Sequence, residues 1–129
     1  MYPITTLTGS LLALGYIYLS LQVIKLRRKY KVVLGCNEFT ELEMAIRAHG
    51  NFNEYAPLIL ILLLCAEANQ ANWIVLLILV FFFIVGRIIH AYAFLKEKHH
   101  LKYRMQGMTI TFIVIICLSF LNLSLLFLK

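Results

Sequence analysis

The sequence has few charged residues and few residues that would interrupt an apolar helix. Lys, Arg, Asp and Glu make up 14% of the 129 residues, and only two residues are proline. Soluble domains contain about 25% charged and about 45–50% apolar residues, whereas this chain is 62% hydrophobic. A chain this short has too much surface to bury that excess. The composition therefore excludes a soluble monomer and a disordered chain, and it indicates an integral membrane protein with one domain, residues 1–129.

Cysteine is also scarce. Cys36, Cys65 and Cys117 form no C-x-x-C pair, so they predict neither a disulfide framework nor a zinc site. His99-His100 lies in a basic loop, where we expect it to be solvated rather than bound to a metal. No Lys or Arg precedes the first apolar run. Because a cleavable signal peptide needs a basic n-region, we expect the first apolar segment to remain in the mature protein.

Four apolar segments predict an all-α bundle of four transmembrane helices, with spans at about 4–24, 40–69, 73–95 and 105–128. The second segment has only a short continuous apolar run, 56–66, so its helix must begin earlier. Thr40-Glu41-Leu42-Glu43 matches the S/T-x-x-E capping box and predicts a start at Thr40. We expect Pro57 to kink this helix unless its neighbours satisfy the freed carbonyl.

The basic residues predict the orientation of the bundle. Five Lys or Arg residues lie in 25–31 and four in 96–104, whereas the opposite side has only Lys129. The positive-inside rule then places both basic loops in the cytoplasm and both termini outside. The net charge of +6 follows from this topology, so we expect membrane lipids and no nucleic acid as partners. Residues 25–31 are expected to contact phospholipid headgroups.

The most informative residues are the polar ones inside the spans. Arg47, Asn51 and Glu54 are spaced i, i+4, i+7 and share one helix face, while Arg87 and His90 are spaced i, i+3 on the third helix. A charge at bilayer depth costs about 2.5–3.5 kcal/mol on insertion scales. One interpretation is a structural ion pair such as Glu54 with Arg87. The other is a polar cavity, open toward the cytoplasm, that binds a zwitterionic peptide or amino acid.

The second span carries a recognisable motif. The segment Arg47–Pro57, RAHGNFNEYAP, resembles the second-helix signature R-A-x-x-N-x-x-E-Y/N-x-P of the MAPEG family, the membrane-associated proteins of eicosanoid and glutathione metabolism. Gly86-Arg87-Ile88-Ile89-His90 is similar to the third-helix motif of that family, and Ser20–Ile24 followed by Arg27-Arg28 is similar to the end of its first helix. The resemblance covers essentially the whole chain and is closest to the bacterial relatives of microsomal glutathione transferase.

The resemblance implies a homotrimer in the bacterial inner membrane, with glutathione bound between neighbouring subunits near the cytoplasmic face. The residues that it assigns to binding are Arg47, Asn51, Glu54 and Tyr55, completed by Arg27, His49, Arg87 and His90. It also implies an arginine at the start of the fourth helix that stabilises the glutathione thiolate. Ungapped counting from Arg87 places that position on Leu101 or Tyr103, so its assignment to Arg104 requires a shift of one to three residues. Phe94 stands where related enzymes often carry a tyrosine.

Three functions follow from these features. The first is a membrane-bound glutathione-dependent transferase or peroxidase that acts on hydrophobic electrophiles, with Arg104 as the thiol-activating residue. The second is a non-catalytic relative that binds a lipid or glutathione and acts as a scaffold. The third is a small multidrug transporter. A transporter of that type would be expected to carry a carboxylate in its first span, and residues 4–24 contain none.

Overall fold

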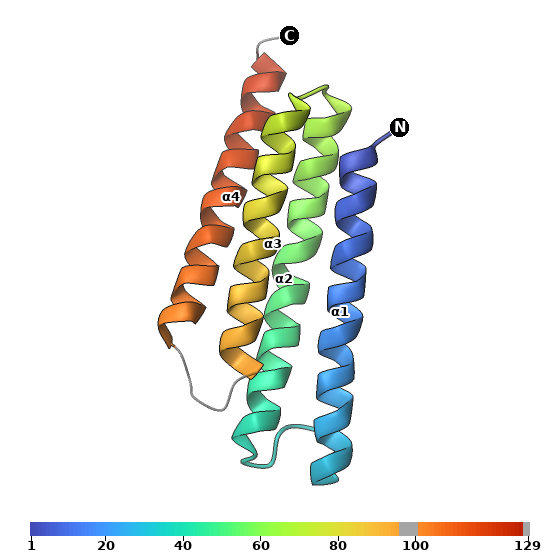
Figure 1. Ribbon diagram of the computed structural model, residues 1–129, viewed down its shortest axis with the longest axis vertical. Helices are drawn as coiled ribbons and strands as arrows, with labels where there is room; N and C mark the ends of the chain where they lie inside the picture. Colours follow the sequence, from blue (N-terminus) through green and yellow to red (C-terminus); the bar gives the residue numbers. More distant parts are fainter. Residues whose placement is uncertain (96–100, 128–129) are drawn as a thin grey trace.

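The computed structural model describes residues 1–95 and 101–127, and within them the chain forms four long helices and no strand (Figure 1). The helices run alternately up and down: α1 is Pro3–Tyr30, α2 is Thr40–Ala68, α3 is Trp73–Leu95 and α4 is Leu101–Phe127. All four are long and apolar enough to cross a membrane. The predicted all-α four-helix membrane bundle is thereby confirmed. Lys96, Lys98 and His99-His100 lie outside the described residues.

The helix ends differ most from the expected spans at two places. α1 continues six residues past 24 to Tyr30, and its last turn carries the basic side chains that a helix C-terminus favours. α4 begins at Leu101, four residues before the expected start. α2 begins at Thr40 as expected, but the predicted capping box is wrong. The N-cap residue is Phe39, and no side chain caps the helix.

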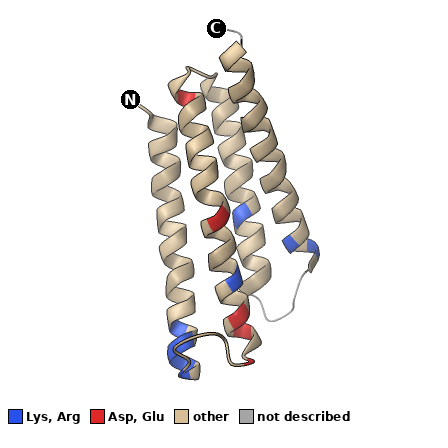
Figure 2. Ribbon diagram, turned by 180° about the vertical axis from the view of Figure 1, so that it is seen from behind, with Lys and Arg blue, Asp and Glu red and all other residues tan. Residues whose placement is uncertain are grey.

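α1 and α2 are longer than a bilayer is thick. At about 1.5 Å per residue, helices of 28 and 29 residues span about 42 Å and about 44 Å, against about 30 Å of hydrocarbon. Figure 2 shows Lys and Arg gathered at one end of α1, an end that the helix length would carry beyond the hydrocarbon. There Lys29 Nζ lies 2.8 Å from a Glu41 carboxylate oxygen. At the opposite end, the Glu67 carboxylate accepts hydrogen bonds from the backbone N–H groups of Ile4 and Thr5 at 2.9 and 2.8 Å. The chain thus ties both ends of α1 to α2.

α2 is the central helix of the bundle. It packs against α1, α3 and α4, whereas α1 meets α3 only sparsely and makes no close approach to α4 within the described residues. Ile59 and Leu63 of α2 are fully buried against Leu76 and Phe83 of α3. The helix remains unbroken through Pro57.

α3 and α4 share the most extensive contact, and glycines permit it. A Cβ atom added to Gly107 would lie 2.7 Å from the carbonyl oxygen of Gly86 and 2.7 Å from Cβ of His90. Because no side chain separates the two backbones, the residues before and after this crossing are brought close to one another. His90 and Arg104, which lie about one turn from it on the same side, belong to the site described next.

Candidate functional site

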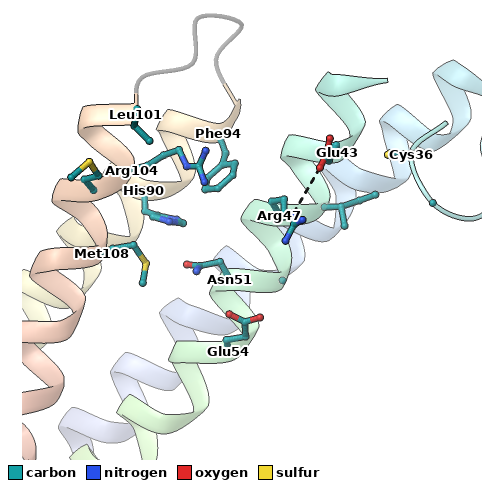
Figure 3. A pocket seen from close by; sticks show the side chains of 14 residues that line it. Cys36, Glu43, Arg47, Asn51, Glu54, His90, Phe94, Leu101, Arg104 and Met108 are labelled. Carbon is teal, nitrogen blue, oxygen red and sulfur yellow. Dashed lines mark ion pairs between the residues drawn. The ribbon is translucent and has the colours of Figure 1, made fainter. Parts of the chain in front are cut away.

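A polar cavity of about 680 Å³ opens between α2, α3 and α4 toward the end of the bundle that holds the 31–39 connection. The residues around it include four polar side chains of α2, two ring-bearing residues of α3 and, from α4, an arginine and a methionine (Figure 3). In that order they are Glu43, Arg47, Asn51 and Glu54, then His90 and Phe94, then Arg104 and Met108. The backbone of Gly35 and the side chain of Cys36 close one edge.

The α2 side of the cavity is a continuous polar face. Its residues are separated by four, four and three positions, so each lies about one turn above the last. Arg47 Nε is 3.9 Å from Glu43 Oε1, and both side chains are exposed. Glu54 is exposed too, and it forms no ion pair or hydrogen bond with any other described residue. A carboxylate at the expected membrane depth, with no partner among the described residues, requires water, a ligand or another subunit beside it.

Arg87 lies behind this face rather than on the cavity wall. It is only 3% exposed. Its guanidinium donates to Asn51 Oδ1 at 2.8 Å and contacts Met108 Sδ at 3.7 Å, and it lies 5.6 Å from the ring centroid of Tyr55. Nε has no acceptor within the described residues. The expected Glu54–Arg87 pair is therefore not formed, and Arg87 instead fixes the Asn51 amide that faces the cavity.

The opposite wall carries the thiol-activating candidate. The guanidinium carbon of Arg104 lies 4.1 Å from the ring centroid of Phe94, and the imidazole of His90 lies 4.9 Å from the same ring. Arg104 forms no ion pair with any carboxylate in 1–95 or 101–127. Its cation is thus stacked on an aromatic face and remains available to an anion in the cavity.

Three of the expected residues lie elsewhere in the single chain. His49 faces α1, with Nε2 3.0 Å from Ser20 Oγ and its ring 4.6 Å from that of Tyr16. Arg27 donates to the carbonyl oxygens of Val33 and Gly35 at 3.0 and 3.1 Å. Tyr55 packs on Phe112. The chain therefore gathers five of the nine expected residues around the cavity: Arg47, Asn51, Glu54, His90 and Arg104.

Glu43 and Cys36 are among the cavity residues that were not anticipated from the sequence. Glu43 lies one turn before Arg47, so extending the i, i+4, i+7 spacing backward by four residues would have found it. Cys36 reaches the edge because Arg27 folds the 32–35 segment back against the end of α1. No sequence pattern signals that fold, since it depends on backbone carbonyls.

Comparisons with known proteins agree with this architecture. The family model described as MAPEG family matches residues 5–124. The chain is also similar to Inner membrane protein YecN of Escherichia coli strain K12, with 34% identity over 122 residues that cover 93% of this chain and 90% of that protein. The protein of the same name from E. coli O6:H1 strain CFT073 matches with the same identity and coverage.

Proposed function

The chain belongs to the MAPEG family, and from this premise we propose that it is a glutathione-dependent transferase or peroxidase of the membrane, acting on hydrophobic electrophiles. The observation that carries the proposal is the set of charges around one cavity. Arg47 and Arg104 supply two cations, Glu43 and Glu54 supply two carboxylates, and Asn51 supplies an amide that both donates and accepts. Glu43 lies 3.9 Å from Arg47 in an exposed, long ion pair, so Glu54 is the carboxylate left for a cation of the ligand.

This donor set fits glutathione, which carries two carboxylates and one ammonium group at neutral pH. The two guanidinium groups match the carboxylates, and Glu54 matches the ammonium group. Arg87 supports the fit indirectly, because it holds the Asn51 side chain from behind. Glutathione contributes the nucleophilic thiol, whose ordinary pKa is near 8.5, so that little thiolate exists at neutral pH without a cation nearby.

Arg104 is the residue that we assign to thiolate stabilisation. Phe94 holds its guanidinium at the cavity wall, so the cation is positioned before a substrate arrives and needs little reorganisation. Transfer to an aryl chloride would form a carbon–sulfur bond and break the carbon–chlorine bond, releasing chloride and a proton to water. The electrophile would enter from the bilayer, because the exposed faces of the helices at this level are apolar.

A homotrimer would complete the site. Glu54 and Arg47 are exposed at or near membrane depth in the single chain, and burial against a neighbouring subunit would remove them from lipid. We propose that neighbouring α1 helices cover this face. The protein is an integral membrane protein. We assign it to the bacterial inner membrane with the cavity toward the cytoplasm and both termini outside, an orientation that the basic residues at the cavity end favour.

Turnover by the intact protein in detergent tests the assignment. Wild-type protein is expected to conjugate glutathione to chlorodinitrobenzene, and Arg104→Ala is expected to lose about 100-fold or more of the rate, as on removal of one transition-state donor elsewhere. Arg28→Ala is the matched control, because Arg28 is exposed on α1 and does not line the cavity. Glutathione binding without turnover toward any electrophile would instead favour the scaffold. Equal rates for Arg104→Ala and wild type would refute the role of Arg104.

A further inference from the structure

A second, separate depression runs along the other side of α2, between α1 and α3. Its inner part has a volume of about 610 Å³ and an almost wholly apolar lining, with Leu12 and Leu19 of α1 facing Ile84 and Ala91 of α3. Among the described residues, Arg87 is the one charged residue that lines it, and its guanidinium is turned toward Asn51 and Met108 on the far side. The volume lies within the range of about 300–1,000 Å³ that holds small ligands.

The apolar part continues into a polar part at the basic end of the bundle. A neighbouring cavity of about 430 Å³ shares Tyr18 and Leu95 with it and is lined by Gln22, Lys25 and Lys29. The distance along α1 from Leu11, near one end of the groove, to Lys25, at the other end, is about 21 Å. One leaflet contributes about 15 Å of the roughly 30 Å of hydrocarbon. The groove therefore has the length of one leaflet plus a headgroup.

The charge of the polar part matches one phosphodiester. Lys25 and Lys29 carry two positive charges, and Glu41 carries one negative charge. Lys29 and the Tyr30 hydroxyl both donate hydrogen bonds to the Glu41 carboxylate. Because Lys29 is paired with Glu41, the unmatched cation is Lys25, which has no ion-pair partner within the described residues.

We propose that the α1–α3 groove is a binding site for one anionic diacyl phospholipid, with an acyl chain along Leu12, Leu19 and Ala91 and the phosphodiester against Lys25. Basic pockets between transmembrane helices are a recurring form of headgroup site. The lipid would fill the gap that the sparse α1–α3 contact leaves and would hold α1 on the bundle. The polar cavity lies across α2 from this groove, and Phe94 and Arg87 stand between the two.

Reconstitution in nanodiscs tests the proposal without any glutathione. The full-length protein is placed in phosphatidylcholine discs, and phosphatidylglycerol with the same acyl chains is titrated in while thermal stability and lipid retained per chain, by native mass spectrometry, are measured. We expect wild type to retain phosphatidylglycerol in preference to phosphatidylcholine. Lys25→Gln is expected to weaken that preference about fivefold. Lys31→Gln, which removes the same charge from the same end of α1 but lines neither part of the groove, is expected to leave the preference unchanged.

Ala91→Leu tests the acyl-chain part of the groove. The larger side chain would occupy the space between α1 and α3, so the retained lipid should be lost while the helix content stays the same. Equal stabilisation by the two lipids, or an equal effect of Lys25→Gln and Lys31→Gln, would overturn the proposal. So would a variant Ala91→Leu that dissociates into monomers without any change in retained lipid, because a second copy of the chain would then be the occupant. Inorganic phosphate alone should not reproduce the stabilisation, and if it does the acyl chain has no role.

Discussion

Replacing Gly107 with alanine is expected to force α3 and α4 apart. The new Cβ would lie 2.7 Å from the Gly86 carbonyl oxygen and 2.9 Å from the His90 backbone nitrogen. Ordinary contact begins at 3.4 Å, so the backbones must separate by about 0.7 Å, and no flexible side chain can move instead. Overpacking of this kind costs about 1–3 kcal/mol. The higher helix preference of alanine over glycine offsets this cost by about 0.5–1 kcal/mol.

Gly50→Ala is the matched control for this cost. A Cβ at Gly50 meets nothing within 4 Å, so this variant gains the same helix preference without the clash. The two variants should therefore differ in free energy of unfolding by about 1–3 kcal/mol, with Gly107→Ala the less stable. Gly86→Ala should fall between them, because its Cβ would lie 3.0 Å from an Ile110 side-chain atom and 3.2 Å from the Gly107 carbonyl oxygen.

Reversible unfolding of the protein in mixed micelles with increasing SDS measures these differences. Because His90 and Arg104 both lie about one turn from the Gly86–Gly107 crossing, on the side of the cavity, Gly107→Ala should also weaken glutathione binding, as measured by calorimetry at a temperature where the variant is folded. If Gly107→Ala were as stable as Gly50→Ala, the close approach of the two helices would be wrong, and with it the geometry of the cavity wall.

Three further substitutions test other contacts. Glu54→Gln should weaken glutathione binding by about 10- to 100-fold in calorimetry, the value of one charge-assisted hydrogen bond, whereas Glu38→Gln outside the cavity should not; unchanged affinity would reduce Glu54 to a structural role. Asn51→Ala should destabilise the protein by about 1.5–3 kcal/mol because Arg87 loses its acceptor, and the exposed Asn53 provides the control Asn53→Ala. Glu67→Ala should cost about 0.5–2 kcal/mol by uncapping α1; no change in SDS unfolding would contradict the cap.

The sequence predicted the bundle well because hydrophobic length and polar spacing are local properties. The α2 helix was expected through a polar stretch as far back as Thr40, and its start agrees with the structure. The shared face of Arg47, Asn51 and Glu54 was predicted from helical spacing alone, and all three border the cavity. Their role in binding stays a prediction.

The departures have physical causes. His49 was included through family resemblance, but at about 100° per residue it lies about 200° from both Arg47 and Asn51 and so faces α1. Arg87 lies on the same helix as His90, less than one turn away. Its side chain nevertheless stays behind the cavity face, where it donates a hydrogen bond to Asn51. Arg27 turns to the 32–35 carbonyls once Lys31 adopts a left-handed conformation. These side-chain directions depend on tertiary contacts, which the periodicity of the sequence does not reveal.

The hydrogen bonds from Arg27 to the 32–35 segment would couple the cavity to the thickness of the surrounding bilayer. α1 is longer than the hydrocarbon layer of a typical membrane, and it packs mainly against α2. A mismatch between its apolar length and the bilayer thickness would therefore change the tilt of α1. Arg27 would carry that tilt to Gly35, at the rim of the cavity. Thicker and thinner membranes would then present different entrances to the same polar chamber.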